Sequence, residues 1–506
     1  MIFDRFSPTK NNTKSVTETD PSRLNQQTPG NDQWIQVGVW MLIVFVIALP
    51  LRVIDLNSVP ANLSPDEADN LTTYLLAKYT GFPSIFGFNW NGAPALNAYL
   101  IGWGWELSGQ SIAGVRIISA LVTAVGCSLF FYLIYLVARN KALAFGLALL
   151  LMTNPWFLNF SRSGWENSWN AVAALLIVLG FYMLYEQRNT KIALYLLITG
   201  AVLGFYFYHP GKLYIPSVFV LLLLGQLVPA YRVSYRAVGV FALVAGLLIL
   251  PQLGPMLCTN IATKYQAPVM QRVLGPPCTI VNQKLLLMSQ GQELPIRIQK
   301  DGWHRIERVS VLAQEEPLQL LQESIKKNLR GFLRFAREDF NAPLNKRYIP
   351  LDSPPIAPLL AGLYIFGLVI ALVKFPYIAL FYLMVLLPVQ VLSLRTPDAA
   401  RAVHIVPLIY FFVGVCIYQI VELGKRYSQR YSQRYSQSLA NILSPLIMVG
   451  MVVIALHQGV VYWRWIRSPQ ALEAREPAVA SQQYPEWLQA STERIQAANS
   501  GAISQR

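Results

Sequence analysis

Apolar runs of membrane-spanning length recur along this chain of 506 residues and constrain its fold more than any other feature. A helix needs about 20 apolar residues to cross roughly 30 Å of hydrocarbon. The chain is 54% hydrophobic and only 13% charged, whereas soluble domains are about 25% charged. The sequence therefore predicts an all-α polytopic membrane protein with eleven helices, at approximately 34–53, 114–138, 142–160, 168–186, 191–208, 213–230, 236–253, 356–374, 376–394, 402–422 and 439–462.

The predicted helices divide the chain into two membrane modules, 34–253 and 356–462. Residues 1–33 are polar and rich in Asn, Thr, Gln and Lys, which predicts a disordered cytoplasmic tail. Between the modules, 254–355 is predicted to be a large outer loop of irregular or mixed α/β structure. The last segment, 463–506, is predicted to be an outer C-terminal tail.

Lysine and arginine are distributed unevenly between the short loops on the two sides of the predicted membrane. Eleven fall in the loops on the N-terminal side and four in those on the other side. The positive-inside tendency therefore predicts a cytoplasmic N-terminus and an outer C-terminus. The net charge of +15 also predicts contact with anionic lipid head groups. The chain has neither zinc-finger spacing nor a basic helix with heptads, so nucleic acid is not an expected partner.

The outer loop at 54–113 follows the first predicted helix and mixes amphipathic stretches with turn residues. Asp66–Tyr79 and Ala95–Leu107 are predicted to form helices that lie on the membrane surface. In the second outer loop, leucine and phenylalanine recur at helical spacing from Pro317 to about Glu338, which predicts a third amphipathic helix.

Three carboxylates lie close together in the first outer loop, at Asp66, Glu67 and Asp69. Ser64 followed by Pro65 and, at the third helical position, Glu67 is typical of a capping box at a helix start. This local role accounts for Glu67. It does not account for Asp66, which has no capping duty at the second helical position. Asp66 is therefore the stronger candidate for a chemical role.

Further ionisable side chains gather in the predicted outer loops and at the outer ends of the helices. Charges near hydrocarbon are costly and usually face a cavity or a partner. Carboxylates, arginines and aromatic residues on one side favour an anionic, ring-bearing substrate reached from the membrane. The candidates are Arg116, Arg162, Glu166, His209, Lys212, Arg401 and His404.

Several of these candidates have a structural explanation that competes with the functional one. Glu166 is one helical turn from Arg162 and is explained equally well by an ion pair with it. The turn His209–Lys212 fits interfacial anchoring, and Arg401 fits snorkelling to lipid head groups. Arg116 lies near a helix N-terminus, where the helix dipole disfavours a cation, so the sequence predicts an anion beside it.

The order of these features resembles the GT-C glycosyltransferases that use polyprenyl-phosphate sugars, in particular the protein O-mannosyltransferase and aminoarabinose (lipid A) transferase group of glycosyltransferase family 39. The resemblance covers 34–230 best and implies a GT-C fold in a bacterial cytoplasmic membrane. The similar segments are Arg52, Asp66-Glu67-Ala68, Gly92–Leu100, Gly114–Ala120, Ser161-Arg162 followed by Glu166, and Asp352–Pro355.

The resemblance also implies roles for the candidates, with a polyprenyl-phosphate sugar as donor and a protein, lipid or glycan as acceptor. Asp66 would be the general base for the acceptor hydroxyl, and Glu67 and Glu166 would shape the acceptor side. Asp66 and Glu166 would also be the place for a divalent cation, Mg²⁺ or Mn²⁺. Arg116 would hold the lipid phosphate, on which charge develops as the sugar leaves. Further candidates for substrate binding are Arg162, His209, Lys212, Arg401 and His404.

The four cysteines fall into two groups. Cys127 and Cys416 lie inside predicted membrane helices and are predicted to be packing residues. Cys258 and Cys278 share the second outer loop, where an oxidising compartment would allow them to form a disulfide.

Two other functions fit a polytopic membrane protein of this composition. A lipid-linked sugar transporter or flippase should show polar or broken helices at mid-bilayer and internal repeats, whereas the predicted helices are almost purely apolar in their middles. A glycan polymerase or ligase would place its catalytic loop late in the chain, whereas here the early loop carries the acids. The sequence therefore favours sugar transfer at the outer surface, with Asp66 in its chemistry.

Overall fold

The computed structural model describes residues 31–81, 84–87, 94–187, 189–265, 316–334, 355–392, 397–431, 433–474 and 479–504. The predicted N-terminal tail, up to residue 30, and most of the predicted loop 254–355 lie outside these residues. The described chain is overwhelmingly helical, and an isolated antiparallel β-bridge joins Leu63 to Val479.

Seven helices of the described chain are long and apolar enough to cross a membrane. They are α2 (Asn31–Val53), α5 (Ile112–Ala138), α8 (Trp169–Tyr185), α9 (Thr190–Phe207), α11 (Tyr235–Tyr265), α20 (Val406–Tyr431) and α21 (Gln433–Ile466). Three shorter apolar helices are α10 (Tyr214–Gly225), α17 (Pro358–Lys374) and α18 (Pro376–Val391). Together with one bent pair, they correspond to the eleven predicted segments, so the prediction of an all-α polytopic membrane protein is confirmed.

The third predicted segment is bent rather than straight. Its two parts, α6 (Lys141–Thr153) and α7 (Pro155–Ser161), meet at 64°. At the break, the Asn154 side chain accepts a hydrogen bond from the Phe157 amide (2.9 Å), and Pro155 begins α7. Proline disfavours helical backbone at the residue before it and suits the first helical position, so the Asn154-Pro155 pair ends one helix and starts the next.

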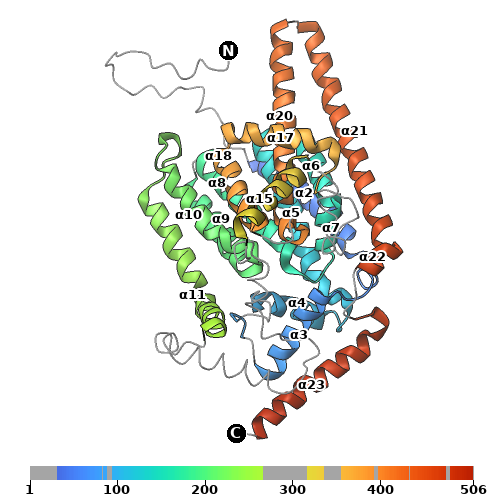
Figure 1. The fold of residues 1–506 in the computed structure, drawn as a ribbon. Helices are drawn as coiled ribbons and strands as arrows, with labels where there is room; N and C mark the ends of the chain where they lie inside the picture. Colours follow the sequence, from blue (N-terminus) through green and yellow to red (C-terminus); the bar gives the residue numbers. More distant parts are fainter. Residues whose placement is uncertain are drawn as a thin grey trace.

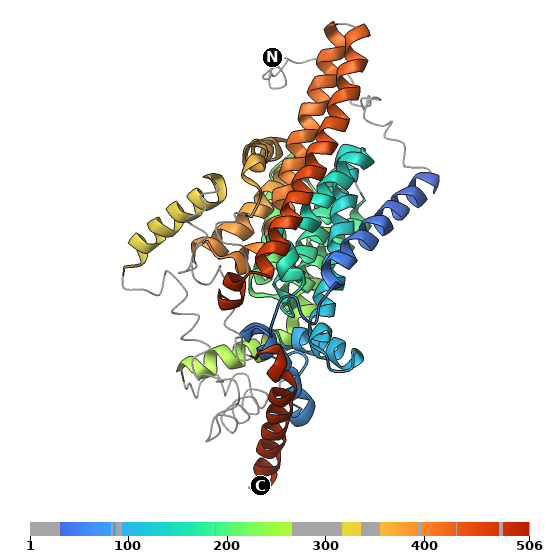
Figure 2. The same ribbon diagram turned by 90° about the vertical axis from the view of Figure 1, so that its right-hand side faces the viewer.

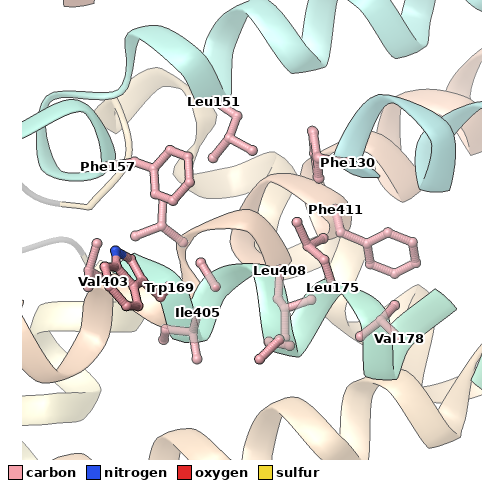
Figure 3. Packing of buried hydrophobic residues seen from close by; sticks show 14 of the residues in the cluster. Phe130, Leu151, Phe157, Trp169, Leu175, Val178, Val403, Ile405, Leu408 and Phe411 are labelled. Carbon is pink, nitrogen blue, oxygen red and sulfur yellow. The ribbon is translucent and has the colours of Figure 1, made fainter. Parts of the chain in front are cut away.

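Among the long helices, α8 is the most deeply buried. Its Trp169 and Leu175 pack among apolar side chains from neighbouring helices in the core (Figure 3). The peripheral helices α2, α11 and α21 instead keep large apolar side chains exposed, among them Leu42, Leu243 and Leu446. Helices that are apolar on their exposed side fit a lipid environment, so the core centres on α8 and these outer helices face the membrane.

The helices of the first outer loop and the end of the chain lie together at one end of the bundle (Figure 1). They are α3 (Pro65–Thr80), α4 (Ala95–Leu107) and the C-terminal helix α23 (Tyr484–Ser504). At the opposite end, the α20–α21 hairpin extends beyond the other helices (Figure 2). The two helices predicted in the first outer loop are therefore present as α3 and α4. The first turn of α3 carries the acidic residues Asp66 and Glu67 at this end of the bundle.

The amphipathic helix predicted in the second outer loop is present as α15 (Pro317–Leu329), continued by a short π-helical stretch at Arg330–Arg334. The Ser324 hydroxyl donates to the Val391 carbonyl at the end of α18 (2.6 Å). Leu318 is exposed, as expected for a helix whose apolar side meets a lipid interface.

Close packing between α17 and α20 depends on Gly367, because a Cβ there would lie 1.8 Å from the Phe412 carbonyl oxygen. We expect Gly367→Ala to lower the free energy of unfolding by about 1–3 kcal/mol, since backbone cannot move aside as a side chain can. Gly362→Ala, on the same helix, is the matched control because nothing lies within 4 Å of its Cβ. Thermal unfolding of the detergent-solubilised variants measures the difference, and equal unfolding temperatures would contradict this contact.

Candidate functional site

α3 begins with the capping box that the sequence predicts. The Ser64 hydroxyl accepts a hydrogen bond from the Glu67 amide (3.4 Å), and the Glu67 carboxylate accepts one from the Ser64 amide (2.9 Å). Pro65 takes the first helical position, and Gly81 ends the helix in the left-handed conformation, with φ 72°. The cap fixes the first turn of α3, on which Asp66 is half-buried.

The Glu67 carboxylate also forms an ion pair with Arg116 of α5, and both side chains are fully buried. Arg116 Nε donates to Glu67 Oε1 (2.7 Å), and Nη2 donates to Oε2 (3.2 Å). The other guanidinium donors reach the backbone carbonyls of Leu56, Pro60 and Asn62, at 2.7 to 2.9 Å. A guanidinium has five N–H groups, so all of the donors of Arg116 are used inside the protein.

The anion predicted beside Arg116 is therefore Glu67 itself. Glu67 Oε1 accepts a further hydrogen bond from the Gly164 amide (2.9 Å), so both of its oxygens are engaged. These contacts correct two assignments made from the resemblance. Arg116 has no donor left for a lipid phosphate, and Glu67 supports the site instead of facing a substrate, because full burial and complete hydrogen bonding commit both groups to the fold.

Arg162 is a second buried cation, and its Nη donors go to the end of α2 and to the start of the first outer loop. Its Nη1 donates to the Leu51 carbonyl (2.9 Å), and its Nη2 donates to those of Ile54 (2.6 Å) and Val59 (2.7 Å). The guanidinium carbon also lies 4.7 Å from the ring centroid of Trp463, at the end of α21. Arg162 thus ties the loop to the bundle, and these contacts point to a structural role in place of the predicted substrate contact.

Glu166 is buried and faces α3, not Arg162. Its Oε2 accepts a hydrogen bond from the Asn70 side-chain amide (3.0 Å), which also donates to the Gly164 carbonyl (3.2 Å). Asn70 lies one helical turn after Asp66, so the contact brings the Glu166 carboxylate toward the first turn of α3. Asp66 and Glu166 lie within electrostatic range of each other. Two residues predicted from separate loops therefore share one site.

The turn before α20 brings a cation to the same place. Asp398 Oδ1 accepts a hydrogen bond from the Arg401 amide (3.1 Å) at the start of α19 (Ala399–Ala402), and Asp398 Oδ2 pairs with Arg401 Nε (3.4 Å). Asp398 is itself held by Gln390 of α18, whose side-chain oxygen accepts from the Asp398 amide (2.9 Å). The Arg401 side chain is 29% exposed, so a substrate can reach it, unlike the buried Arg116 and Arg162.

Tyr208, at the end of α9, lies where these groups converge. Its ring packs edge-on against Trp165, with 5.9 Å between centroids, and the Asn170 side-chain amide donates to its carbonyl (3.1 Å). Burial raises the pKa of the Tyr208 hydroxyl. Four charged side chains also act on it electrostatically, namely Arg401, which lowers this pKa, and Asp398, Glu166 and Asp66, which raise it.

The turn η2 (His209–Leu213) follows Tyr208 and carries further basic side chains. Lys212 Nζ lies 3.3 Å from His209 Nδ1, and both side chains are half-buried. Burial lowers the pKa of Lys212 to about 8. His404, by contrast, is almost fully buried beside Tyr214, with 6.2 Å between ring centroids. His404 therefore lies inside the bundle, whereas Lys212 lies in the turn next to the converging charges.

A metal site is not apparent at these carboxylates. No group of three or more His, Cys, Asp or Glu side chains in the described ranges is placed to hold a metal ion. Hard divalent cations prefer a shell of six or more oxygen ligands, and Asp66 and Glu166 supply two carboxylates, of which Glu166 Oε2 accepts an N–H from Asn70. The Mg²⁺ or Mn²⁺ predicted at these two residues stays a prediction.

The predicted disulfide lies outside the described side chains, since Cys278 and the side chain of Cys258 are not among them. Cys127 and Cys416 are buried free thiols, as predicted for packing residues.

Four side chains at the site were not predicted as site residues, namely Tyr208, Asn70, Asp398 and Gln390. The sequence carries a signal for two of them. Asn70 is one helical turn from Asp66 and shares its face, and Asp398 stands where a helix N-cap belongs. Tyr208 and Gln390 carry no such signal, because their chain neighbours do not show which side chains they meet in the fold.

Comparison with known proteins gives matches to solved structures alone, since no family model and no curated protein sequence matches this chain. The crystal structure of ArnT from Cupriavidus metallidurans bound to undecaprenyl phosphate is 13% identical, with a TM-score of 0.45, covering 94% of this chain and 79% of that one. The arabinosyltransferase EmbB from Mycobacterium smegmatis is 13% identical, with a TM-score of 0.35, covering 90% of this chain and 44% of that one.

The Glu67–Arg116 pair gives a direct test of what supports the site, because removing one partner leaves the other charge buried and uncompensated. We expect Glu67→Gln to lower the free energy of unfolding by about 3–5 kcal/mol. Lys78→Ala is the control, since the Lys78–Glu106 pair is 39% and 34% exposed and such exposed pairs contribute only about 0–1 kcal/mol. Unfolding of the solubilised variants measures both losses, and losses of equal size would contradict the structural role of the buried pair.

Proposed function

We propose that this protein is a membrane glycosyltransferase that moves a sugar from a polyprenyl-phosphate carrier to an acceptor hydroxyl at the outer face of the membrane. The proposal rests on the convergence of two carboxylates, Asp66 and Glu166, and one accessible guanidinium, Arg401, around the side chain of Tyr208. Such a site offers a proton acceptor and an anion-binding group side by side. The resemblance of the first membrane module to the GT-C glycosyltransferases supports the same function.

Asp66 is the residue that we assign as the general base. The helix start is already capped by Ser64 and Glu67, so the half-buried Asp66 carboxylate is not needed to begin α3. A carboxylate that accepts the proton of a hydroxyl makes its oxygen a better nucleophile. Glu166, which Asn70 holds in place, would orient the same hydroxyl from the opposite loop.

Arg401 and Lys212 are the residues that we assign to the carrier phosphate, in place of Arg116. Arg401 is held by Asp398, which in turn is held by Gln390, so its position is fixed before a substrate arrives. Lys212 lies on the turn after Tyr208, where burial lowers its pKa because burial disfavours the charged form. A phosphate beside Lys212 would favour that charged form.

The reaction follows from this placement. The acceptor oxygen forms a bond to the anomeric carbon of the sugar, and its proton passes to the Asp66 carboxylate. The bond between that carbon and the carrier phosphate breaks, and its electron pair leaves with the phosphate, which gains a negative charge. A guanidinium that is already in position, here Arg401, stabilises this charge without reorganisation. Attack from the face opposite the leaving group would invert the anomeric configuration.

The proposed setting is the bacterial cytoplasmic membrane, with the N-terminus inside and the site outside. Support comes from the positive-inside bias, and from the arrangement of α3, α4 and α23 at one end of the bundle while the α20–α21 hairpin extends at the other. The acceptor would be a protein, lipid or glycan that reaches this end from the outer side, and anionic lipids would contact the basic loops of the inner side.

Asp66→Asn removes the proton acceptor while keeping the size of the side chain. We expect sugar transfer from a radiolabelled polyprenyl-phosphate hexose, measured in membrane vesicles, to fall by about 10²–10⁴-fold, the usual contribution of a general base. Binding of polyprenyl phosphate should persist, because the phosphate-binding residues are unchanged. Asp69→Asn, half-buried one turn later on α3, is the matched control and should transfer at the wild-type rate.

Three other outcomes would count against this assignment. Equal transfer by Asp66→Asn and wild type, with both proteins folded, would limit the acidic cluster to helix capping. Wild-type protein that binds or translocates the lipid-linked sugar without transferring it would favour a transporter. Elongation of a lipid-linked glycan that does not depend on Asp66 would favour a polymerase or ligase.

The pH dependence of phosphate binding tests the role of Lys212. Its lowered pKa of about 8 means that the lysine is cationic below pH 8 and loses its charge as the pH rises through that value. The second ionisation of a phosphate monoester, near pH 6, is complete above pH 7, so we expect the affinity for undecaprenyl phosphate to fall between pH 7 and pH 9. Lys212→Met should remove this dependence, whereas Arg401→Gln should weaken binding and leave the dependence in place. An unchanged pH profile in Lys212→Met would contradict the assignment.

A further inference from the structure

The end of the chain returns to the loop that carries the acidic residues. Leu63 and Val479 form an antiparallel bridge in which each amide donates to the other carbonyl, at 3.0 and 3.4 Å. Next to it, the Asn62 amide donates to the Ser481 hydroxyl and the Ser481 amide donates to the Asn62 side-chain oxygen, both at 3.1 Å. Four hydrogen bonds thus join two short segments that lie more than 400 residues apart in the chain.

α23 extends this attachment along α3. The Tyr484 hydroxyl accepts a hydrogen bond from Trp105 Nε1 of α4 (2.5 Å) and donates one to the Gln110 carbonyl (3.2 Å). Tyr484, Ser491 and Ile495 are buried at helical spacing on α23, which packs against α3. Residues 479–495, which we name the strap, therefore contact the loop before α3, the helix α3 itself and α4.

The strap contacts the loop at Asn62, which also accepts a hydrogen bond from Arg116 of the buried ion pair. The Asn62 carbonyl accepts a hydrogen bond from Arg116 Nη2 (2.7 Å), and Arg116 pairs with Glu67, which caps α3. Asn62 adopts the left-handed conformation, with φ 64°, which is uncommon for a residue other than glycine. Asn62 is thus held from one side by Arg116 and from the other by Ser481 of the strap.

We propose that the strap is part of the catalytic apparatus and that Asn62 is a positioning residue, through which the C-terminal segment holds the first turn of α3, and hence Asp66, in its working geometry. This inference rests on the proposed function of Asp66. It adds that the strap, remote in sequence from the acidic cluster, sets the rate of transfer while leaving the phosphate-binding residues Arg401 and Lys212 unaffected.

The loop has a physical need for such support. Both Asp55 and Asn62 have positive φ, at 54° and 64°, a conformation that is uncommon outside glycine although Asp and Asn adopt it more readily than other residues. Its carbonyls are directed inward, to Arg116 and Arg162, which leaves the outward-facing edge at Leu63 to pair with the strap. Without that pairing the Leu63 amide and carbonyl lose their backbone partners.

The test first weakens the attachment of the strap to the loop by substitution and then restores the attachment with a disulfide in the same polypeptide. Ser481→Ala with Tyr484→Phe removes side-chain hydrogen bonds from the strap without altering the loop. We expect kcat to fall about tenfold and the KM for the donor to stay unchanged. The reason is that each lost hydrogen bond changes an equilibrium several-fold. Gln482→Ala, at an exposed neighbouring position, is the matched control and should behave like wild type.

Restoration uses a disulfide at the bridge. Directly opposed, hydrogen-bonded residues of an antiparallel pair have Cα atoms about 5.5 Å apart, within the range that a disulfide spans. Leu63→Cys with Val479→Cys is added to the weakened chain, and transfer is measured in the oxidised and the reduced state of the same protein. We expect oxidation to restore kcat and reduction to remove the gain, while wild-type protein given the same treatments is unchanged.

The outcomes separate this proposal from the proposed function. Unchanged kcat in the weakened chain, or a crosslink that abolishes transfer in otherwise wild-type protein, would overturn the strap as a fixed support. Wild-type protein without any sugar transfer would overturn the proposed function instead. In that case, amide hydrogen exchange of residues 61–67 still tests the strap. Exchange should be faster in the weakened chain and slower after crosslinking, and equal rates would show that the strap does not hold the loop.

Discussion

The buried ion pair between Glu67 and Arg116 fixes the geometry of the whole site end of the bundle. Burying a guanidinium is costly unless its charge is compensated and its donors are hydrogen-bonded. Here one carboxylate and three backbone carbonyls meet that requirement, and all of them come from the loop and helix that follow α2. The loop between α2 and α3 must therefore wrap around Arg116, and the start of α3 is placed as a consequence.

A second buried arginine, Arg162, holds the same loop, and the two arginines separate the charges that build the site from those that can act in it. Arg162 donates to three more carbonyls, one at the end of α2 and two in the loop that follows, and its guanidinium carbon lies 4.7 Å from the ring centroid of Trp463. The loop is therefore held by two cations, one from α5 and one from the end of α7. Both guanidiniums are buried and donate to backbone carbonyls. Asp66 and Arg401 stand on the frame so formed, partly exposed, with the C-terminal strap supporting the outer edge of the loop.

Much of the fold can be predicted from the sequence because its determinants are local. Apolar runs of sufficient length must form helices in a membrane, since no water is present to satisfy a free backbone. The Ser64–Glu67 cap is likewise a contact within one turn, and it is present as predicted. Even the break at Asn154-Pro155 is explained by two adjacent residues, although apolar length alone predicts one continuous helix there.

The sequence by itself determined the class of protein, the apolar helices and the presence of charged side chains at their ends, because each depends on residues within about one helical length. It also marked Asp66 as the acid without a capping duty. Only the tertiary structure decided which charges neutralise each other. Arg116 meets a carboxylate 49 residues away, Glu166 meets Asn70 across 96 residues, and Asn62 meets Ser481 across 419. A side chain's partner depends on how helices pack, so the sequence alone could not tell a structural arginine from one that remains accessible to a phosphate.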